Sequence, residues 1–142
     1  MGLQSLEIQD FRNIVSASLQ VSAGLNLVSG ENAAGKTSLL EAIYCLGRVR
    51  SFRTSIAAQP IRDGQSAFRL VGRVLSPQGR DIPIGLERQK HELKVHLDRQ
   101  PVRRLSDLAG SFPVQVLSGD TPTILNGGPR YRRQSLDWAL FH

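Results

Sequence analysis

The sequence predicts an α/β fold in which antiparallel or mixed strands pack on a glycine-rich loop and the helix that follows it. Residues 30–37 read Gly-Glu-Asn-Ala-Ala-Gly-Lys-Thr, the spacing of a phosphate-binding loop. An apolar segment of strand length, 25–29, precedes this loop, and helical periodicity follows it over 37–47. Strand, loop and helix therefore occur in the order that phosphate binding requires.

Two further strands are expected before the loop. Residues 3–8 are predicted to form the first, and strict apolar and polar alternation over 15–22 predicts the second. Simple P-loop kinases often open directly on the loop strand, whereas ATPase heads of the ABC class first build a small antiparallel sheet. The order of elements therefore favours a P-loop NTPase of the ABC-ATPase head type, in which this N-terminal lobe packs on the P-loop helix.

The loop residues have distinct chemical roles. Gly30 and Gly35 can take backbone angles closed to other residues, so consecutive N–H groups can turn toward a phosphate at the start of a helix. Lys36 is expected to reach the β- and γ-phosphates, and the Thr37 hydroxyl to ligate Mg²⁺. The predicted ATP-binding residues are Gly30, Glu31, Asn32, Ala33, Ala34, Gly35, Lys36 and Thr37. The alternative is a glycine-rich turn that fits the pattern by chance.

The helix after the loop is predicted from apolar residues spaced three and four apart: Leu39, Leu40, Ile43, Tyr44 and Leu46. Cys45, the single cysteine, lies in this pattern and is expected to be a small buried hydrophobe rather than a reactive thiol. An intrachain disulfide is excluded. The three histidines have no partners at metal-ligand spacing, so no zinc site is expected.

Arg48, Arg50 and Arg53 surround Phe52 just after this helix. Such a loop is suited to gripping a phosphate backbone, with the aromatic ring stacking on a base. We expect Phe52 instead to anchor the loop to the core, and the three arginines to contact DNA rather than solvent alone.

Alternating residues predict a three-stranded meander over 68–75, 82–86 and 93–97. The solvent-exposed face of this meander is expected to carry Arg69, Arg73, Arg88, Lys90 and Lys94. A short helix is expected from Val102, Leu105 and Leu108, carrying Arg103 and Arg104. One more strand is predicted over 114–117, with Gln115 within it.

Residues 126–129 are expected to form a loop that leads into a final helix from Pro129. Arg130, Arg132 and Arg133 stand in its first turn, where the helix dipole disfavours positive charge. The binding of an anion such as DNA explains these three arginines better than a contribution to helix stability does. We therefore divide the chain into 1–125, the N-terminal part of the head, and 126–142, a loop and helix start leading into a missing arm or second half.

One catalytic element is missing from the sequence. An NTPase needs an acidic residue after a second apolar strand to hold Mg²⁺, and no run of four apolar residues after the phosphate loop is followed by Asp or Glu. We therefore expect the chain to be part of a longer protein, assign no catalytic residue, and predict that this piece alone binds ATP without hydrolysing it.

The net charge of +6 is unevenly distributed. Residues 1–47 carry a net −2 and the remainder +8, and fifteen of the eighteen basic residues are arginine, which contacts phosphate in bidentate fashion. A second polyanion, nucleic acid, is the partner that this suggests; a solvated basic surface is the alternative. No apolar run reaches membrane-spanning length and no secretory signal is found, so no membrane partner and a cytoplasmic location are expected.

Three stretches carry a family resemblance: IQDFRNI (8–14), VSGENAAGKTSLLEAIYCLGRVRSFRT (28–54) and LNGGPRYRRQSLDWALFH (125–142). With these, the chain resembles the RecF family of bacterial DNA replication and repair ATPases, related to the SMC and Rad50 heads. The resemblance implies nucleotide contacts at 30–37, and nearby positions for Arg12, Asn13 and Gln115. Ser118-Gly119-Asp120 and Ser135 depart from the family pattern.

The resemblance also implies a function. RecF-like proteins are expected to form an ATP-dependent homodimer that binds duplex DNA near single-strand gaps and junctions. They are expected to have weak DNA-dependent ATPase activity and to act with RecO and RecR in recombinase loading and the SOS response. The alternatives are a small-molecule P-loop kinase and a structural fragment without activity of its own. A kinase would be expected to carry an acceptor site and a lid, and would not need the positive excess after residue 47.

Overall fold

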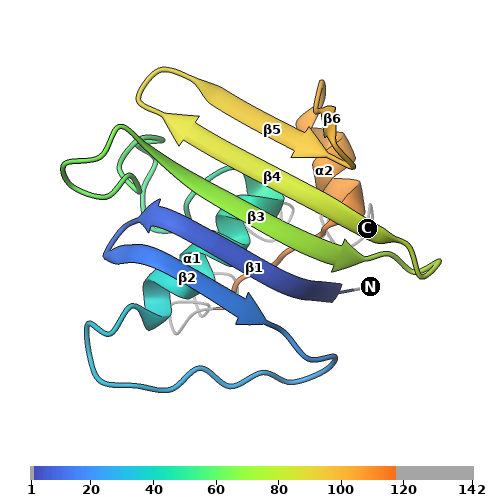
Figure 1. The fold of residues 1–142 in the computed structure, drawn as a ribbon, viewed down its shortest axis with the longest axis horizontal. Helices are drawn as coiled ribbons and strands as arrows, with labels where there is room; N and C mark the ends of the chain where they lie inside the picture. Colours follow the sequence, from blue (N-terminus) through green and yellow to red (C-terminus); the bar gives the residue numbers. More distant parts are fainter. Residues whose placement is uncertain (1, 118–142) are drawn as a thin grey trace, which may run out of the picture.

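The computed structural model describes residues 2–117, which form an antiparallel sheet with two helices (Figure 1). Neighbouring strands lie in the order β2-β1-β3-β4-β5-β6, and each neighbouring pair is antiparallel. The strands are β1 (Gly2–Phe11), β2 (Ile14–Gln20), β3 (Ala67–Leu75), β4 (Asp81–Gln89), β5 (Leu93–Leu97) and β6 (Gln100–Pro101). The helices are α1 (Lys36–Arg48) and α2 (Leu105–Ser111). The two strands before the loop, the P-loop helix and the meander are confirmed.

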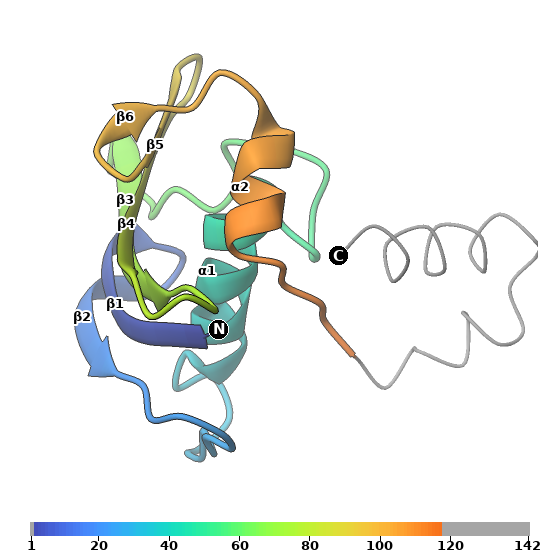
Figure 2. The same ribbon diagram turned by 90° about the vertical axis from the view of Figure 1, so that its right-hand side faces the viewer.

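Both helices lie on the same face of the sheet, which Figure 2 shows edge-on. Alternation along β3 explains why this face is apolar: Phe68, Leu70 and Val74 are buried beneath the helices, whereas Arg69 and Arg73 are exposed on the other face. A half-covered antiparallel sheet requires this pattern, because successive side chains point to opposite faces.

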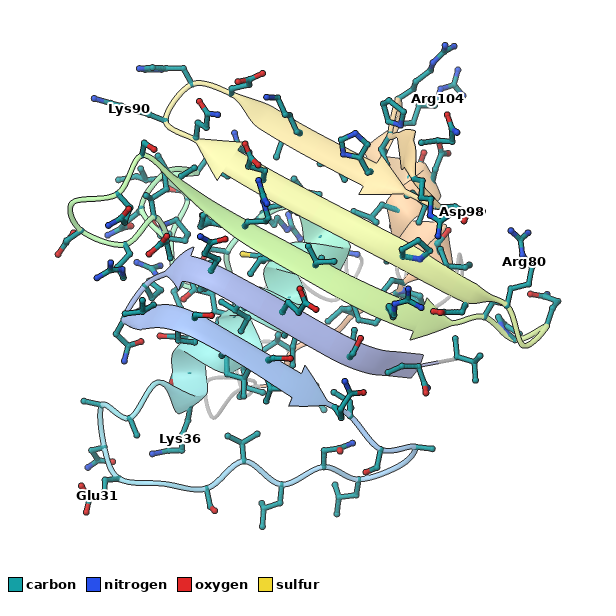
Figure 3. The ribbon with its side chains drawn as sticks, in the orientation of Figure 1. Glu31, Lys36, Arg80, Lys90, Asp98 and Arg104 are labelled. Carbon is teal, nitrogen blue, oxygen red and sulfur yellow. The ribbon has the colours of Figure 1, made fainter. Side chains whose placement is uncertain are left out.

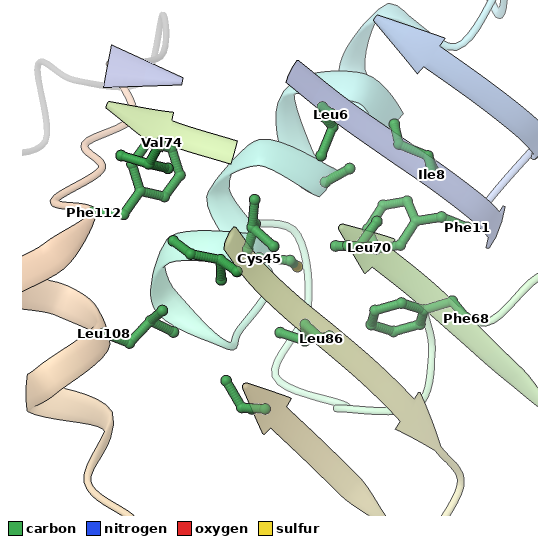
Figure 4. Packing of buried hydrophobic residues seen from close by; sticks show 14 residues of the cluster. Leu6, Ile8, Phe11, Cys45, Phe68, Leu70, Val74, Leu86, Leu108 and Phe112 are labelled. Atoms are coloured by element: carbon green, nitrogen blue, oxygen red, sulfur yellow. The ribbon is translucent and has the colours of Figure 1, made fainter. Parts of the chain in front are cut away.

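The core lies between α1 and the central strands (Figure 4). Phe11 and Phe68 pack edge to face, with ring centroids 4.9 Å apart. On β3, Gly72 interrupts the row of large side chains so that Leu46 of α1 can approach the strand. A Cβ atom at position 72 would lie only 2.4 Å from Leu46 Cδ2. This glycine therefore sets how closely the P-loop helix sits on the sheet.

The buried stripe of α1 differs in phase from the predicted one. Its buried side chains have helical spacing and are Ser38, Glu41, Ala42, Cys45 and Leu46. Leu40, which the apolar pattern assigns to the core, is 50% exposed, whereas Glu41 is fully buried. The apolar pattern failed here because an ion-paired carboxylate replaces an apolar residue on the inner face.

The predicted buried strand over 25–29 is wrong for the described structure. The segment has no strand partner, and Leu25 and Leu27 are 95% and 88% exposed. A strand needs neighbours for its N–H and C=O groups, whatever its hydropathy. Within residues 2–117, no strand pairs with this segment, which runs below β2 and returns to the start of α1 (Figure 1).

Two predictions near the end of the described region need correction. The short helix begins at Leu105, after Arg103 and Arg104, because the Val102 N–H donates to the Val95 carbonyl at 2.9 Å and keeps the chain extended beside β5. The strand over 114–117 is absent, since no strand within residues 2–117 pairs with it. The loop at 126–129 and the final helix lie outside the described residues.

Candidate functional site

The predicted phosphate loop forms one wall of a cleft of about 660 Å³ at the start of α1. The loop contributes Asn32, Ala33, Gly35, Lys36 and Thr37 to its lining. Gly30, Ala33 and Gly35 all have positive φ angles, of 153°, 64° and 97°. These angles turn the chain sharply just before the helix, as a phosphate-binding loop requires.

The helix start leaves N–H groups available to a ligand. α1 begins at Lys36, and its N-cap residue, Gly35, provides no side-chain cap. The first intrahelical bond runs from the Leu39 N–H to the Gly35 carbonyl at 2.9 Å. The N–H groups of the first turn therefore have no intrahelical acceptor and carry the positive end of the helix dipole. This arrangement suits an anion.

Lys36 is folded against the loop that precedes it. Its Nζ donates to the carbonyls of Gly30 and Glu31 at 2.6 and 2.5 Å. Figure 3 shows this side chain at the start of α1, with Glu31 on the neighbouring loop. The ammonium group thus stabilises the loop and lines the cleft. Three rotatable donors on a flexible stem allow it to exchange a carbonyl for a phosphate oxygen.

Asn13 holds the loop against the first hairpin. Its Nδ2 donates to the Ala33 carbonyl at 3.1 Å, and its Oδ1 accepts from Ser38 Oγ at 2.7 Å. A Cβ on Gly35 would lie 3.4 Å from Asn13 Nδ2. The side chain that the family resemblance put near the nucleotide therefore lines the cleft.

Arg12 lines the cleft next to Asn13 and is fixed by a buried carboxylate. Its Nη2 and Nε donate to Glu41 Oε1 and Oε2 at 2.7 and 3.0 Å. Burial alone would raise the pKa of Glu41, but hydrogen bonds from Arg12 and Ser51 and the charges of Arg12 and Arg53 together lower this pKa. Sequence reasoning missed Glu41, although an acidic residue beside apolar helix positions was a usable signal.

A loop after α1 completes the cleft with residues that the sequence did not single out: Gln59, Ile61, Arg62 and Asp63. Arg62 is anchored by its Nε, which donates to Asp10 Oδ1 at 2.9 Å. Nothing in the local pattern of this irregular loop marks it as part of the site. It reaches the cleft because backbone bonds tie it to the end of β1, from the Arg12 N–H to the Pro60 carbonyl and from the Arg62 N–H to the Asp10 carbonyl.

Gln115 is not among the residues that line the cleft. Its neighbour Val114 packs on Gly47, where an added Cβ would lie 2.6 Å from Val114 Cγ2. Gly47 is at the opposite end of α1 from Lys36, about 16 Å away at 1.5 Å per residue. Within the described residues, Gln115 thus follows a segment at the far end of the P-loop helix.

The arginines predicted to contact DNA occupy different positions: Arg48 is the last residue of α1, whereas Arg50 and Arg53 follow the helix. Arg53 points toward the cleft and donates to Glu41 Oε2 at 3.3 Å. Arg50 lines a second cavity, of about 710 Å³, which also includes Arg53 and Phe52. Phe52 packs edge to face on Tyr44 with ring centroids 5.5 Å apart. It therefore anchors the loop to α1, as expected.

The predicted basic face of the meander is only partly formed. Arg88 shares the inner face with Leu86 and lines the second cavity, because it is two residues along the same strand. Lys90 lies in the turn between β4 and β5 (Figure 3). Basic side chains on the outer face, away from the helices, pair with acids: Arg69 with Glu87, Arg73 with Asp81, and Lys94 with Glu92. Arg80, in the turn before β4, pairs with Asp98 after β5. The pairs on the outer face lower its net positive charge.

Cys45 is 3% exposed, and its thiol pKa is raised to about 12, first by burial and then by the charge of Glu41. It is the buried hydrophobe that its position predicted. In the described part of the chain, no group of three or more His, Cys, Asp and Glu side chains is placed to hold a metal ion. No helix within residues 2–117 has the length and apolar character needed to cross a membrane. Arg130, Arg132 and Arg133 lie outside the described residues.

Comparison with known proteins identifies the fold and its relatives. Proteins named DNA replication and repair protein RecF from Edwardsiella ictaluri and Shigella boydii are 44% and 46% identical to the whole chain. The chain spans 40% of the length of each. A solved structure of the recombination mediator protein RecF with ATP, from the RecFOR pathway, matches 95% of this chain and 38% of its own, with a TM-score of 0.84 and 29% identity.

A more distant solved structure, of an SMC ATPase, matches 98% of this chain and 99% of its own with a TM-score of 0.78. At 16% identity it is evidence for the fold alone. The predicted P-loop, ABC-ATPase type of fold is confirmed, as is the resemblance to RecF. The family model described as the RecF/RecN/SMC N terminal domain matches residues 2–128. The chain therefore belongs to the family of RecF/RecN/SMC N-terminal domains.

Proposed function

We propose that the cleft at the start of α1 binds the phosphates of ATP. The observation that carries this proposal is the uncapped helix start at Gly35, which faces a cleft lined by Lys36, Arg12 and Arg53. These three side chains, together with Arg62 in the same lining and the free N–H groups of the helix start, suit a polyphosphate. The similar RecF structure that contains ATP supports the same assignment.

Residues 30–37 would bind the phosphates, and the Thr37 hydroxyl would ligate Mg²⁺. Thr37 lines the cleft, and its hydroxyl oxygen is the kind of ligand that Mg²⁺ prefers beside phosphate oxygens. Mg²⁺ would neutralise phosphate charge. Lys36 would orient the β- and γ-phosphates, while Asn13 keeps the loop in place. Arg12, which also lines the cleft, would contact the nucleotide through its guanidinium group.

For the longer protein, we propose a role in DNA replication and repair as an ATP-dependent homodimer in the cytoplasm. It would bind duplex DNA near single-strand gaps, act with RecO and RecR, and help recombinase loading and the SOS response. The names of its relatives and the positive excess after residue 47 support this role. Candidate DNA contacts are Arg48, Arg50, Arg130, Arg132 and Arg133; Arg53, predicted with them, is assigned here to the nucleotide cleft that it lines. Membership of this family favours DNA repair over a small-molecule kinase.

Weak DNA-dependent ATPase activity is proposed for the longer protein only. In the 142 residues, no run of four apolar residues after the phosphate loop is followed by an acidic residue that could hold Mg²⁺. We therefore propose that this part of the head binds ATP without turning it over.

A titration of the chain with fluorescent ATP and Mg²⁺ tests the nucleotide proposal. The parent chain should bind, and Lys36→Ala should weaken binding at least about tenfold, because charged hydrogen bonds to phosphate are lost. Lys94→Ala is a matched control, since Lys94 lies on the outer face and pairs with Glu92 at 3.4 Å. Equal binding by the parent and Lys36→Ala would refute the proposed site.

Fluorescence anisotropy with a gapped DNA duplex tests the DNA role. The longer protein should bind more tightly with ATP, and binding should weaken steeply with salt because arginine–phosphate contacts release counterions. Absence of DNA binding with and without ATP would contradict the DNA-repair role while leaving the nucleotide site in place.

A further inference from the structure

Glu41 is a fully buried carboxylate just behind the proposed nucleotide cleft. It lies on α1 four residues after Thr37, has 0% exposure, and is not among the residues that line the cleft. A buried charge is costly unless it is paired and hydrogen-bonded. Its position in the core therefore requires specific partners.

These partners come from two separate loops. Arg12, between β1 and β2, donates through Nη2 at 2.7 Å and Nε at 3.0 Å, which is a bidentate contact. Ser51 and Arg53, after α1, donate at 2.5 and 3.3 Å. One carboxylate thus joins both loops to the helix that carries Lys36.

The bidentate contact fixes the plane of the Arg12 guanidinium. A third donor, Nη1, reaches the Gln59 carbonyl at 3.3 Å. Arginine has five N–H donors, so about two remain for another acceptor. Because Arg12 lines the cleft and its side chain is only 17% exposed, these donors are held at a wall of the cleft rather than in open solvent.

Arg53 donates a single hydrogen bond to Oε2 of the same carboxylate, at 3.3 Å, and also lines the cleft. Two guanidinium groups would repel each other without a counterion between them. Glu41 supplies one negative charge for two positive charges, which leaves a positive excess facing the cleft. If Glu41 only anchored the two loops to the helix, Arg12 and Arg53 would not both need to line the cleft.

We infer that Glu41 is a positioning residue for the nucleotide: its buried carboxylate orients the guanidinium groups of Arg12 and Arg53 toward the bound phosphates. This inference rests on the proposed ATP site. Preorganised donors lose little freedom on binding, so removal of the carboxylate should weaken ATP binding even where the fold persists.

A double-mutant cycle tests this role. Glu41→Gln is nearly isosteric but removes the charge, and Arg12→Lys keeps a positive charge while removing the guanidinium fork. With fluorescent ATP and Mg²⁺, Glu41→Gln should weaken binding about tenfold in the parent, as expected for coupled neighbours. In the Arg12→Lys background the same change should cost less than about threefold, because the guanidinium group with the bidentate contact to Glu41 is already missing.

The matched control is Glu87→Gln. Glu87 also pairs with an arginine, Arg69 at 2.9 Å, but on the outer face of the sheet away from the cleft. Its removal should leave ATP affinity unchanged. Circular dichroism in the absence of nucleotide identifies any variant that fails to fold. If Glu41→Gln does not fold, Glu41→Asp can replace it in the same cycle. Aspartate keeps the negative charge, but its shorter side chain moves the carboxylate away from Arg12.

Equal losses from the Glu41 change in both backgrounds would overturn the inference, because an effect on ATP that acts through Arg12 must shrink when Arg12 is replaced. Unchanged ATP affinity in a folded Glu41 variant would overturn it as well. Failure of the proposed function is recognised separately: in that case the parent chain and Lys36→Ala bind ATP equally poorly. Loss of binding in Lys36→Ala together with an unaffected Glu41 variant rejects the positioning role alone.

Discussion

Ser38 on the P-loop helix donates a hydrogen bond to Asn13 in the turn of the first hairpin, with 2.7 Å between Oγ and Oδ1. The other end of the same amide donates to the Ala33 carbonyl at 3.1 Å. One side chain therefore connects the hairpin, the phosphate loop and the helix. The antiparallel strands before the loop thus have a direct structural role at the cleft.

Replacement of Asn13 by alanine should loosen the phosphate loop. Asn13→Ala removes both hydrogen bonds and leaves the Ser38 hydroxyl, which is buried, without this acceptor. The expected cost is about 1 kcal/mol in unfolding free energy and roughly fivefold in ATP affinity. Urea unfolding and a titration with fluorescent ATP measure the two effects.

Asn26→Ala is the control for this change. Asn26 makes similar local bonds, to Ser22 and the Gly24 carbonyl, but does not line the cleft. ATP affinity should therefore stay close to that of the parent. An equal loss of affinity in both variants would show that general loosening of the chain, rather than the Asn13 clamp, controls binding.

Substitution of Gly72 should displace the P-loop helix from the sheet. In Gly72→Ala the new methyl group would lie 2.4 Å from Cδ2 of the fully buried Leu46 and 3.3 Å from Leu3 Cδ1. Overpacking of this kind costs about 1–3 kcal/mol. Urea unfolding followed by circular dichroism should give a lower midpoint than for the parent.

Gly85→Ala provides a matched control on the adjacent strand. An added Cβ there meets only His96 Cβ, at 4.0 Å, which is ordinary contact. Its unfolding midpoint should be at least as high as that of the parent, because alanine reduces the freedom of the unfolded chain. Equal destabilisation by both substitutions would mean that the approach of Leu46 does not limit position 72.

The sequence correctly predicted those parts of the fold that depend on residues close together in the chain. The glycines at 30 and 35 predicted the loop, and alternation predicted β2 and β3. Failures occurred where partners decide the structure. Residues 25–29 are apolar enough for a strand, but in the described part of the chain no strand forms hydrogen-bonded pairs with them.

The site shows the same division. Lys36 was identified from a motif, and Arg12 and Asn13 from family resemblance, and all three line the cleft. Glu41 was missed because its role depends on Arg12, which is 29 residues away in sequence. Arg88 was assigned to the wrong face because the expected basic surface was built from charge, whereas the position of Arg88 two residues after buried Leu86 determines its side.

Folding stability should depend on the charge of Glu41 at acidic pH. Hydrogen bonds and nearby arginine charges hold the pKa of this carboxyl below its ordinary value of 4.5 despite burial. The unfolded chain therefore takes up a proton first as pH falls. The stabilisation is complete above the unfolded pKa and is lost as pH falls through the folded pKa, with a slope of at most about 1.4 kcal/mol per pH unit.

Urea unfolding of the parent and Glu41→Gln at several pH values checks this dependence. The difference in unfolding free energy between them should shrink as the pH falls below 4.5, the ordinary pKa of the carboxyl. Glu87→Gln is the comparison: hydrogen bonds from Arg69 and Gln89 lower the Glu87 pKa, but this exposed pair should contribute less and be weakened by salt. A difference for Glu41→Gln that does not change with pH would contradict the lowered pKa.

Cys45 should react with thiol reagents only when the chain opens. Its side chain is 3% exposed, and its thiol pKa of about 12 leaves roughly one thiolate in ten thousand at pH 8. As the only cysteine, it reports on the core without ambiguity. Iodoacetamide labelling followed by mass spectrometry should be at least about a hundredfold slower for native than for urea-unfolded protein.

The same labelling experiment separates global opening from local access. If Cys45 reacts through unfolding, Gly72→Ala should label faster than the parent in proportion to its lost stability, because the open population rises. Gly85→Ala should label at the parental rate or below it. Labelling of the parent at nearly the unfolded rate would mean that the thiol is reached through the neighbouring cavity, which Cys45 lines together with Tyr44 and Phe52.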